Sequence, residues 1–142
     1  MDSIKLTLPT KPEYVSQARL TIASVANNMG FSIGDVEDLK VAVSEACTNA
    51  LNHSKNPDTT YDLTYVVENQ KLVFTVTDRG VGFEPENVAT PDLNGKQLGG
   101  FGLFIIKSLM DRVEIISEQG SGTTITMIKN LSTTHEVWAK NQ

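Results

Sequence analysis

The chain has 142 residues, 39% of them hydrophobic and 20% charged, so it suits one globular domain with a substantial core rather than a disordered or repetitive protein. Its formal net charge of −5 disfavours a nucleic-acid surface, and no apolar run approaches the roughly 20 residues of a membrane-spanning helix. The N-terminus lacks the pattern of a signal peptide and the single cysteine, Cys47, suits a reducing compartment, so we expect a cytoplasmic protein that contacts neither membrane nor nucleic acid directly.

The first half of the chain predicts one strand and two helices. Residues 4–8 alternate apolar and polar side chains, as in a short edge strand. Pro12 opens the first helix, and its apolar stripe continues as far as a closing glycine, Gly30. A second helix begins at residues 32–35 and ends near Ser54, before a proline.

The second half predicts four strands and one helix around a long loop. These elements are a hairpin of strands 61–67 and 72–77, a helix over residues 102–110, and closing strands 113–117 and 123–128. Residues 80–100 are rich in glycine and proline and lack an apolar period, which is typical of a functional loop such as a lid. The tail over residues 132–142 is polar and expected to be loose, although Trp138 could dock.

This order of elements predicts the fold class. A strand, two helices, two strands, a helix and two strands indicate an α/β two-layer sandwich, with a mixed, mostly antiparallel sheet and helices on one face. A Rossmann sheet is disfavoured because strands and helices do not alternate. We expect one domain over residues 1–131, followed by the polar tail 132–142.

The second predicted helix carries the first candidate site. Glu45 and Asn49 are four residues apart and therefore lie one above the other on its polar face. A carboxylate beside an amide oxygen suits a general base and a Mg²⁺ ligand whose remaining ligands are phosphates and water. A solvated helix face is the alternative, and taken alone it is the more common reading. Cys47 falls on the apolar face and is interpreted as a core residue.

A second candidate motif is Asp78-Arg79-Gly80-Val81-Gly82, directly after a predicted strand. Asp78 could accept a hydrogen bond from the exocyclic amine of adenine, and the glycines would let the backbone pass close to the base. The alternative is an ordinary turn at the end of a strand.

Two further motifs contain glycine. Gly99-Gly100-Phe101-Gly102 leads into a helix, whose N-terminal amides and dipole suit phosphate; ordinary loop-to-helix geometry is the alternative. Gly95-Lys96 is no Walker A motif because the following Ser/Thr is missing, and Lys96 is more simply a solvated lysine than a phosphate ligand. Gly122-Thr123-Thr124 begins the last strand, where a hydroxyl could touch the base or merely occupy a strand position.

In order and spacing, these motifs resemble those of the GHKL ATPases, which share the Bergerat fold. The N box matches Glu45 to Asn49, the first glycine box matches Asp78-x-Gly80-x-Gly82, the second matches Gly100-x-Gly102, and the late threonine site matches Thr123-Thr124. Within that group the chain is most similar to the bacterial anti-sigma factor serine kinases of the RsbW and SpoIIAB type. This likeness covers residues 4 to 131 and includes the string Ser44-Glu45-Ala46-Cys47-Thr48-Asn49-Ala50.

The resemblance implies a function and a set of site residues. Such proteins are typically homodimers that sequester a sigma factor and use ATP with Mg²⁺ to phosphorylate a serine of a STAS-type anti-anti-sigma protein. Glu45 would be the catalytic base, Asn49 the Mg²⁺ ligand, and Arg19 part of the partner surface. The implied nucleotide-binding residues are Asn49, His53, Asp78, Gly80, Gly82, Gly99, Gly100, Phe101, Gly102, Leu103, Thr123 and Thr124.

The chain departs from the family pattern at three places. Arg79 stands where the family more often has an acidic residue, residues 83–98 have no clear match, and the tail after Leu131 is individual to this chain.

Two other functions stay open. The first alternative is a non-catalytic module in which ATP only gates partner binding. The second is a histidine kinase ATPase domain separated from its phosphoacceptor, which is disfavoured because no dimerisation helix with an acceptor histidine is present.

Overall fold

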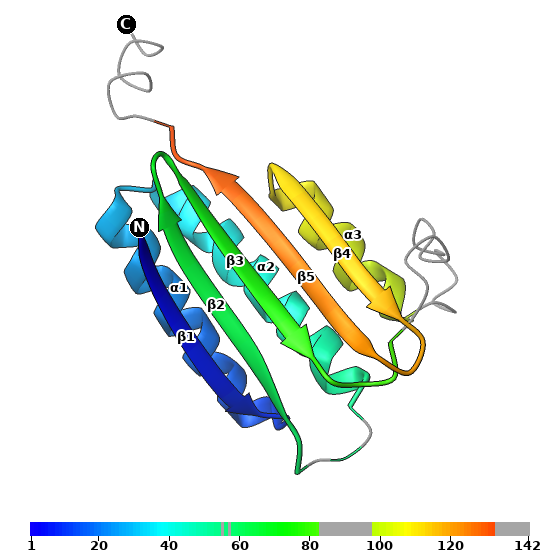
Figure 1. Cartoon of the computed structure of the whole chain (residues 1–142). Helices are drawn as coiled ribbons and strands as arrows, with labels where there is room; N and C mark the ends of the chain where they lie inside the picture. Colours follow the sequence, from blue (N-terminus) through cyan, green and yellow to red (C-terminus); the bar gives the residue numbers. More distant parts are fainter. Residues whose placement is uncertain (55, 57, 83–97, 133–142) are drawn as a thin grey trace, which may run out of the picture.

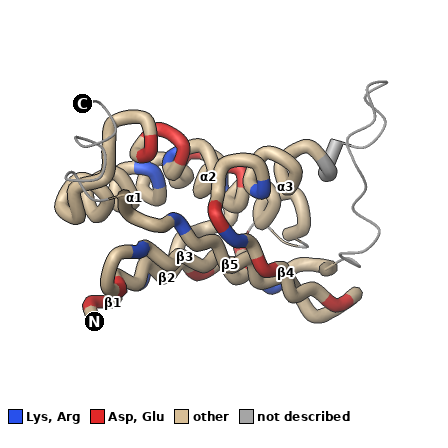
Figure 2. The backbone as a smooth tube through the Cα atoms, turned by 90° about the horizontal axis from the view of Figure 1, so that it is seen from above, with Lys and Arg blue, Asp and Glu red and all other residues tan. Residues whose placement is uncertain are grey.

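The computed structural model describes residues 1–54, 56, 58–82 and 98–132, which form two layers. One layer is a five-stranded sheet, and the α-helices all cover the same face of it (Figure 1). Figure 2 shows the two layers from the edge, with the opposite face of the sheet left open. The predicted α/β two-layer sandwich is therefore confirmed. Within these residues, no helix combines the length and apolar character needed to cross a membrane.

The elements follow the predicted order along the chain. They are β1 (Asp2–Pro9), a short 3-10 turn η1 (Pro12–Tyr14), α1 (Val15–Met29), α2 (Ile33–Asn52), β2 (Thr60–Glu68), β3 (Lys71–Asp78), α3 (Leu98–Leu109), β4 (Arg112–Glu118) and β5 (Gly122–Asn130). Several boundaries differ by a few residues, and Pro12 opens the 3-10 turn while α1 begins at Val15. The largest difference from the sequence-based expectation in the second half is in α3, which begins at Leu98 and therefore includes the glycine run that was expected to precede it. The expectations for residues 83–97, Lys96, Trp138 and most of the tail lie outside the described residues.

The sheet is antiparallel throughout its described strands, rather than mixed. Its strand order is β1-β2-β3-β5-β4, and each neighbouring pair is antiparallel. The crossover through α3 brings β4 into the same direction as β3, which would give a parallel pair if the two strands were neighbours. Because β5 folds back from β4 and pairs between them, no parallel pair forms.

Local sequence signals set the ends of the two long helices. Gly30 follows α1 with φ 96°, a left-handed conformation that glycine adopts readily and that ends the helix. The side chain of Ser32 then accepts a hydrogen bond from the backbone N–H of Asp35, at 3.1 Å, and so caps the N-terminus of α2. Both termini agree with the sequence-based expectation.

The core lies between the helices and the inner face of the sheet. It includes Leu39 and Val43 of α2 and the ring of Phe74 on β3, all at most 1% exposed. Tyr65 on β2 donates its hydroxyl to the backbone carbonyl of Ala18 on α1, at 3.1 Å, which satisfies a polar group inside this core. α2 is the central helix and packs against both α1 and α3. Consequently one side of α2 is core while its other side is available for a site.

Cys47 belongs to this core, as predicted. Its side chain is fully buried, and burial raises the pKa of the thiol to about 11. A thiol held neutral in an apolar setting is a poor nucleophile. Cys47 is therefore a packing residue.

Candidate functional site

A row of three polar side chains runs along α2. Glu45, Asn49 and His53 are spaced by four residues, so the row extends over about 12 Å at 1.5 Å per residue. Asn49 is 9% exposed, and its amide nitrogen is buried without a hydrogen-bond partner among the described residues. Buried polar groups in proteins are almost always paired. This amide nitrogen is a donor, so it suits a site that is completed by an acceptor on a ligand, such as a phosphate or sugar oxygen.

One end of the row faces α3. A side chain at Gly102 would place its Cβ 3.0 Å from Oε2 of Glu45, so the two helices approach closely at this point. The first amides of α3, from Leu98 onward, have no partner within the helix and lie at the positive end of its dipole. An anion such as a phosphate is favoured there. Glu45 thus lies against the N-terminal half of α3, whose terminus suits a phosphate.

The other end of the row faces the end of β3. Asp78 is 6% exposed, and its Oδ1 accepts a hydrogen bond from the backbone N–H of Gly80, at 2.8 Å. Burial raises the pKa of Asp78, against the opposing effects of the Gly80 amide, the nearby His53 and the Thr123 amide. A carboxylate offers about four lone-pair sites, so Asp78 retains acceptor capacity for a ligand. A buried acceptor of this kind suits the exocyclic amine of adenine.

The loop after β3 is packed tightly against α2 and the β4–β5 turn. The backbone N–H of Val81 donates to the carbonyl of His53, at 3.0 Å, and a Cβ at Gly80 would overlap that same carbonyl. Gly82 has φ 71°, and a Cβ there would overlap the carbonyl of Glu118. Only glycine satisfies both positions, so the two glycines let the loop beside Asp78 pack against the helix and the sheet.

Replacing Gly80 with alanine is expected to lower the free energy of unfolding by about 1–3 kcal/mol and to weaken ATP binding, because the added methyl must displace backbone. Urea denaturation and nucleotide titration measure the two effects. Gly34→Ala is the matched control: its Cβ would meet nothing closer than Ser32 Oγ at 4.0 Å. In helix α2 that change should leave stability equal or raise it by up to about 1 kcal/mol. Equal stability of the two variants would contradict the tight packing at Gly80.

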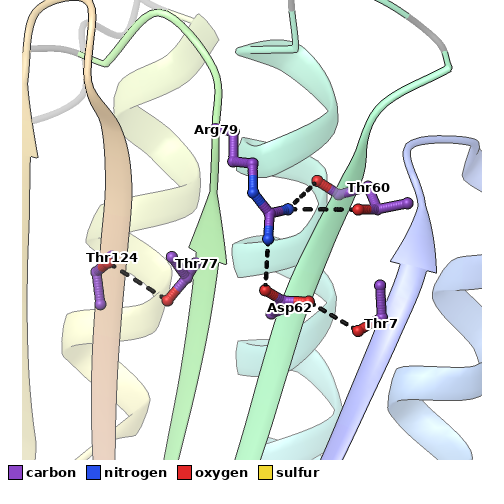
Figure 3. A network of polar contacts seen from close by, with 6 residues as sticks. All are labelled: Thr7, Thr60, Asp62, Thr77, Arg79 and Thr124. Atoms are coloured by element: carbon purple, nitrogen blue, oxygen red, sulfur yellow. Dashed lines mark hydrogen bonds and ion pairs between the residues drawn. The ribbon is translucent and has the colours of Figure 1, made fainter.

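The two threonines at the start of β5 lie on opposite faces of the sheet. Thr123 pairs in register with Asp78, is 2% exposed, and lies on the helix side. Its Oγ1 is 2.7 Å from Oγ of Ser117 on β4. Thr124 instead donates to Thr77 on the open face, at 3.3 Å (Figure 3). The structure thus brings Thr123 beside Asp78 and does not bring Thr124 there, because consecutive strand residues alternate in direction.

The remaining predicted residues divide between the site and the core. Gly99 and Gly100 belong to the first turn of α3, and Phe101 follows them half-buried. Leu103 is 2% exposed and packs into the core. Ser117 was not expected from the sequence, since a serine within a strand gives no local signal of a site.

Arg19 lies beside the Glu45 end of the row. Its Nη1 donates to Oγ of Ser44, at 3.3 Å, and Ser44 in turn donates to the carbonyl of Lys40, at 2.7 Å. A groove of about 270 Å³ opens between α1 and α2 at this place; its lining residues are Arg19, Glu37, Lys40, Val41, Ser44 and Glu45. Glu45 therefore borders both α3 at Gly102 and a surface groove that contains Arg19.

Comparison with known proteins identifies the family of this chain. The family model of the histidine kinase-like ATPase domain matches residues 8–129. The serine-protein kinase RsbW of Oceanobacillus iheyensis is 43% identical over 129 residues, which cover 84% of this chain and 82% of the relative. The serine-protein kinase RsbW of Bacillus velezensis is 38% identical, over 93% of this chain and 88% of the relative.

A solved structure supports the fold independently. The RsbU and RsbW domains of a Mycobacterium tuberculosis protein match 94% of this chain with a TM-score of 0.71 and 20% sequence identity. The match spans 33% of that longer chain. At this identity the likeness establishes the fold alone.

Proposed function

Because the chain belongs to the histidine kinase-like ATPase domain family, we propose that it is a cytoplasmic anti-sigma factor that phosphorylates a serine of a STAS-type anti-anti-sigma protein. Its enzyme class is that of the serine-protein kinases to which it is 36–43% identical. The observation that carries the proposal is the row Glu45, Asn49 and His53, which joins a helix terminus suited to phosphate with a buried carboxylate suited to adenine.

In this proposal the nucleotide lies along α2. Asp78 accepts the adenine amine at one end, and the loop containing Gly80 and Gly82 lies against the base. The α3 amides bind phosphate oxygens at the other end. The row is about 12 Å long, which suits a nucleoside triphosphate lying with its base at Asp78 and its terminal phosphate at Glu45.

Glu45 is assigned the role of general base. Its carboxylate takes the proton of the partner's serine hydroxyl as the serine oxygen forms a bond to the γ-phosphorus. The bond from that phosphorus to the bridging oxygen breaks, and its electron pair leaves with ADP. The groove that holds Arg19 also reaches Glu45, so a partner bound there would present its serine to the base.

Asn49 is assigned the role of Mg²⁺ ligand. Its amide oxygen would be one hard ligand of the ion, and phosphates and water would supply the others. When bound, Mg²⁺ neutralises charge on the phosphates. Asn49→Ala is expected to remove most of the Mg²⁺ dependence of ATP binding and to weaken binding roughly tenfold or more, the size of one interaction with a charged group.

ATP titration with Mg²⁺ and then with a chelator measures this dependence. Asn52→Ala is the matched control, because Asn52 is exposed near the end of the same helix. The quantity compared is the factor by which Mg²⁺ tightens ATP binding. If this factor is the same for Asn49→Ala as for Asn52→Ala, the assignment is contradicted.

The partner-switching part of the proposal concerns binding rather than chemistry. The protein, as a homodimer, would hold a sigma factor until the unphosphorylated STAS protein displaces it, with Arg19 on the shared surface. Size-exclusion chromatography with the sigma factor and STAS protein encoded nearest its gene tests this. We expect one complex with each partner, mutual competition, and weaker binding of both to Arg19→Ala. Failure of the wild-type protein to bind either partner would overturn the anti-sigma role.

A further inference from the structure

Arg79 lies within the nucleotide-binding motif, but its side chain turns away from the site. It follows Asp78 at the end of β3 and extends across the open face of the sheet to β2 (Figure 3). Its Nη1 donates to the backbone carbonyl of Thr60, at 2.9 Å, and lies 3.3 Å from the hydroxyl of that residue. Its Nη2 donates to Oδ2 of Asp62, at 2.9 Å. The guanidinium is therefore held in a fork by two residues of the neighbouring strand.

The hydrogen bonds of Arg79 continue through Asp62 to β1, the edge strand of the sheet. Oδ1 of Asp62 accepts a hydrogen bond from the hydroxyl of Thr7 on β1, at 2.8 Å (Figure 3). The Thr7 hydroxyl first, and then the charge of Arg79, lower the pKa of Asp62, so the carboxylate stays ionised. The side chain of Asp62 is only 19% exposed, whereas that of Arg79 is 57% exposed. Arg79 is thus hydrogen-bonded to a carboxylate on β2 that is itself held by Thr7 on β1.

The backbone of Arg79 is part of the wall of the site. It separates Asp78 from Gly80, whose N–H holds the Asp78 carboxylate. A Cβ at Gly122 would lie 3.2 Å from Cα of Arg79 and would overlap the carbonyl of Asp78. Residues 78–80 are therefore packed against β5 on one side and tied to β2 by the Arg79 side chain on the other. A shift of Arg79 would move the adenine-binding carboxylate with it.

We infer that Arg79 is a positioning residue for nucleotide binding, which fixes the Asp78–Gly80 segment through its fork to Thr60 and Asp62. The inference rests on the proposed ATP site and adds to it a residue that touches no nucleotide. An exposed ion pair contributes little to overall stability. Loss of the Arg79 side chain should therefore change the geometry of the site rather than the stability of the fold. A charge that acted directly on phosphate would instead affect ATP binding through electrostatic attraction.

Arg79→Ala is expected to weaken ATP binding about threefold to tenfold, a change of the size that one well-placed hydrogen bond produces. A fluorescent ATP analogue measures the affinity, and thermal unfolding should show a Tm close to that of the wild type. With a phosphoacceptor, KM for ATP should rise by the same factor while kcat changes less than about twofold, as for lost ground-state binding. Arg79→Lys keeps the charge but not the fork, so it should restore the affinity only partly.

Two further variants separate positioning from electrostatics. Asp62→Asn removes a negative charge, which would strengthen ATP binding if charge alone acted, but here it should weaken binding in the same direction as Arg79→Ala. The double variant should be no weaker than the stronger single variant. Arg112→Ala is the control, because Arg112 is 69% exposed and pairs with Glu114 at 2.7 Å on the far strand β4. Its ATP affinity should equal that of the wild type.

The outcomes distinguish this inference from the proposed function. If the wild type binds ATP and Arg79→Ala binds it as tightly as Arg112→Ala does, the positioning role is wrong while the ATP site stands. Full recovery of affinity in Arg79→Lys would also overturn it, in favour of a purely electrostatic role. A wild-type protein that binds no ATP would overturn both.

Discussion

Replacing Glu45 with glutamine is expected to reduce phosphoryl transfer at least about 100-fold, since a positioned general base contributes roughly 10²–10⁴ to rate. Binding of ATP should change less than about twofold, because glutamine keeps the shape of the side chain beside Gly102 and Glu45 is assigned to the serine proton rather than to a hydrogen bond with the nucleotide. Single-turnover transfer to the STAS partner and ATP titration measure the two quantities separately.

The control for this variant is Glu114→Gln on β4. Glu114 is 52% exposed and pairs with Arg112 at 2.7 Å. Transfer by Glu114→Gln should be close to that of the wild type, because Glu114 belongs to neither the proposed site nor the groove beside Arg19. Transfer by Glu45→Gln at the same rate as Glu114→Gln would remove Glu45 as the base and leave the reaction without an assigned proton acceptor.

Replacing Asp78 with asparagine should weaken ATP binding at least about tenfold, the size of a lost hydrogen bond to a charged group. Asparagine keeps one oxygen for the Gly80 amide but puts an N–H donor where the adenine amine needs an acceptor. Titration with ATP at neutral pH measures the loss. Asp38→Asn, on α2 away from this loop, should bind like the wild type, and equal affinities of the two variants would contradict the adenine assignment.

The same variant should have the opposite effect on folding. Burial raises the pKa of Asp78 in the folded state, so the folded protein binds this proton more tightly than the unfolded chain does. The free energy of unfolding therefore falls as pH rises from the ordinary aspartate pKa to the raised one. Asparagine removes this loss, so Asp78→Asn should be at least as stable as the wild type at neutral pH by thermal unfolding. A clear loss of stability would show that the ionised carboxylate stabilises the fold.

Much of the fold could be predicted because its signals are local. The capping serine of α2, the glycine after α1 and the alternating strands each act within a few residues. The helical period also predicted that Glu45 and Asn49 share a face. Whether the sheet is mixed depends on where β5 inserts relative to β3, and that placement is a long-range pairing that the order of elements leaves undecided.

The site was harder to predict where it depends on which face of the sheet a residue occupies, or on contacts between residues far apart in the sequence. The alternation with buried Ile125 and Met127 indicates that Thr123, rather than Thr124, points toward the helices, so this signal was present in the sequence. The contact between Arg79 and Asp62 had no such signal, because it joins residues that are brought together only by the pairing of β2 with β3.

The central claim is that this chain transfers phosphate from ATP to a partner serine. The most direct measurement incubates the purified protein with radiolabelled ATP, Mg²⁺ and the STAS-domain protein encoded nearest its gene. We predict label on a serine of that partner with the wild type and at least about 100-fold slower labelling with Glu45→Gln. Tight ATP binding without any label on the partner would contradict the kinase assignment and indicate a module in which ATP only gates binding.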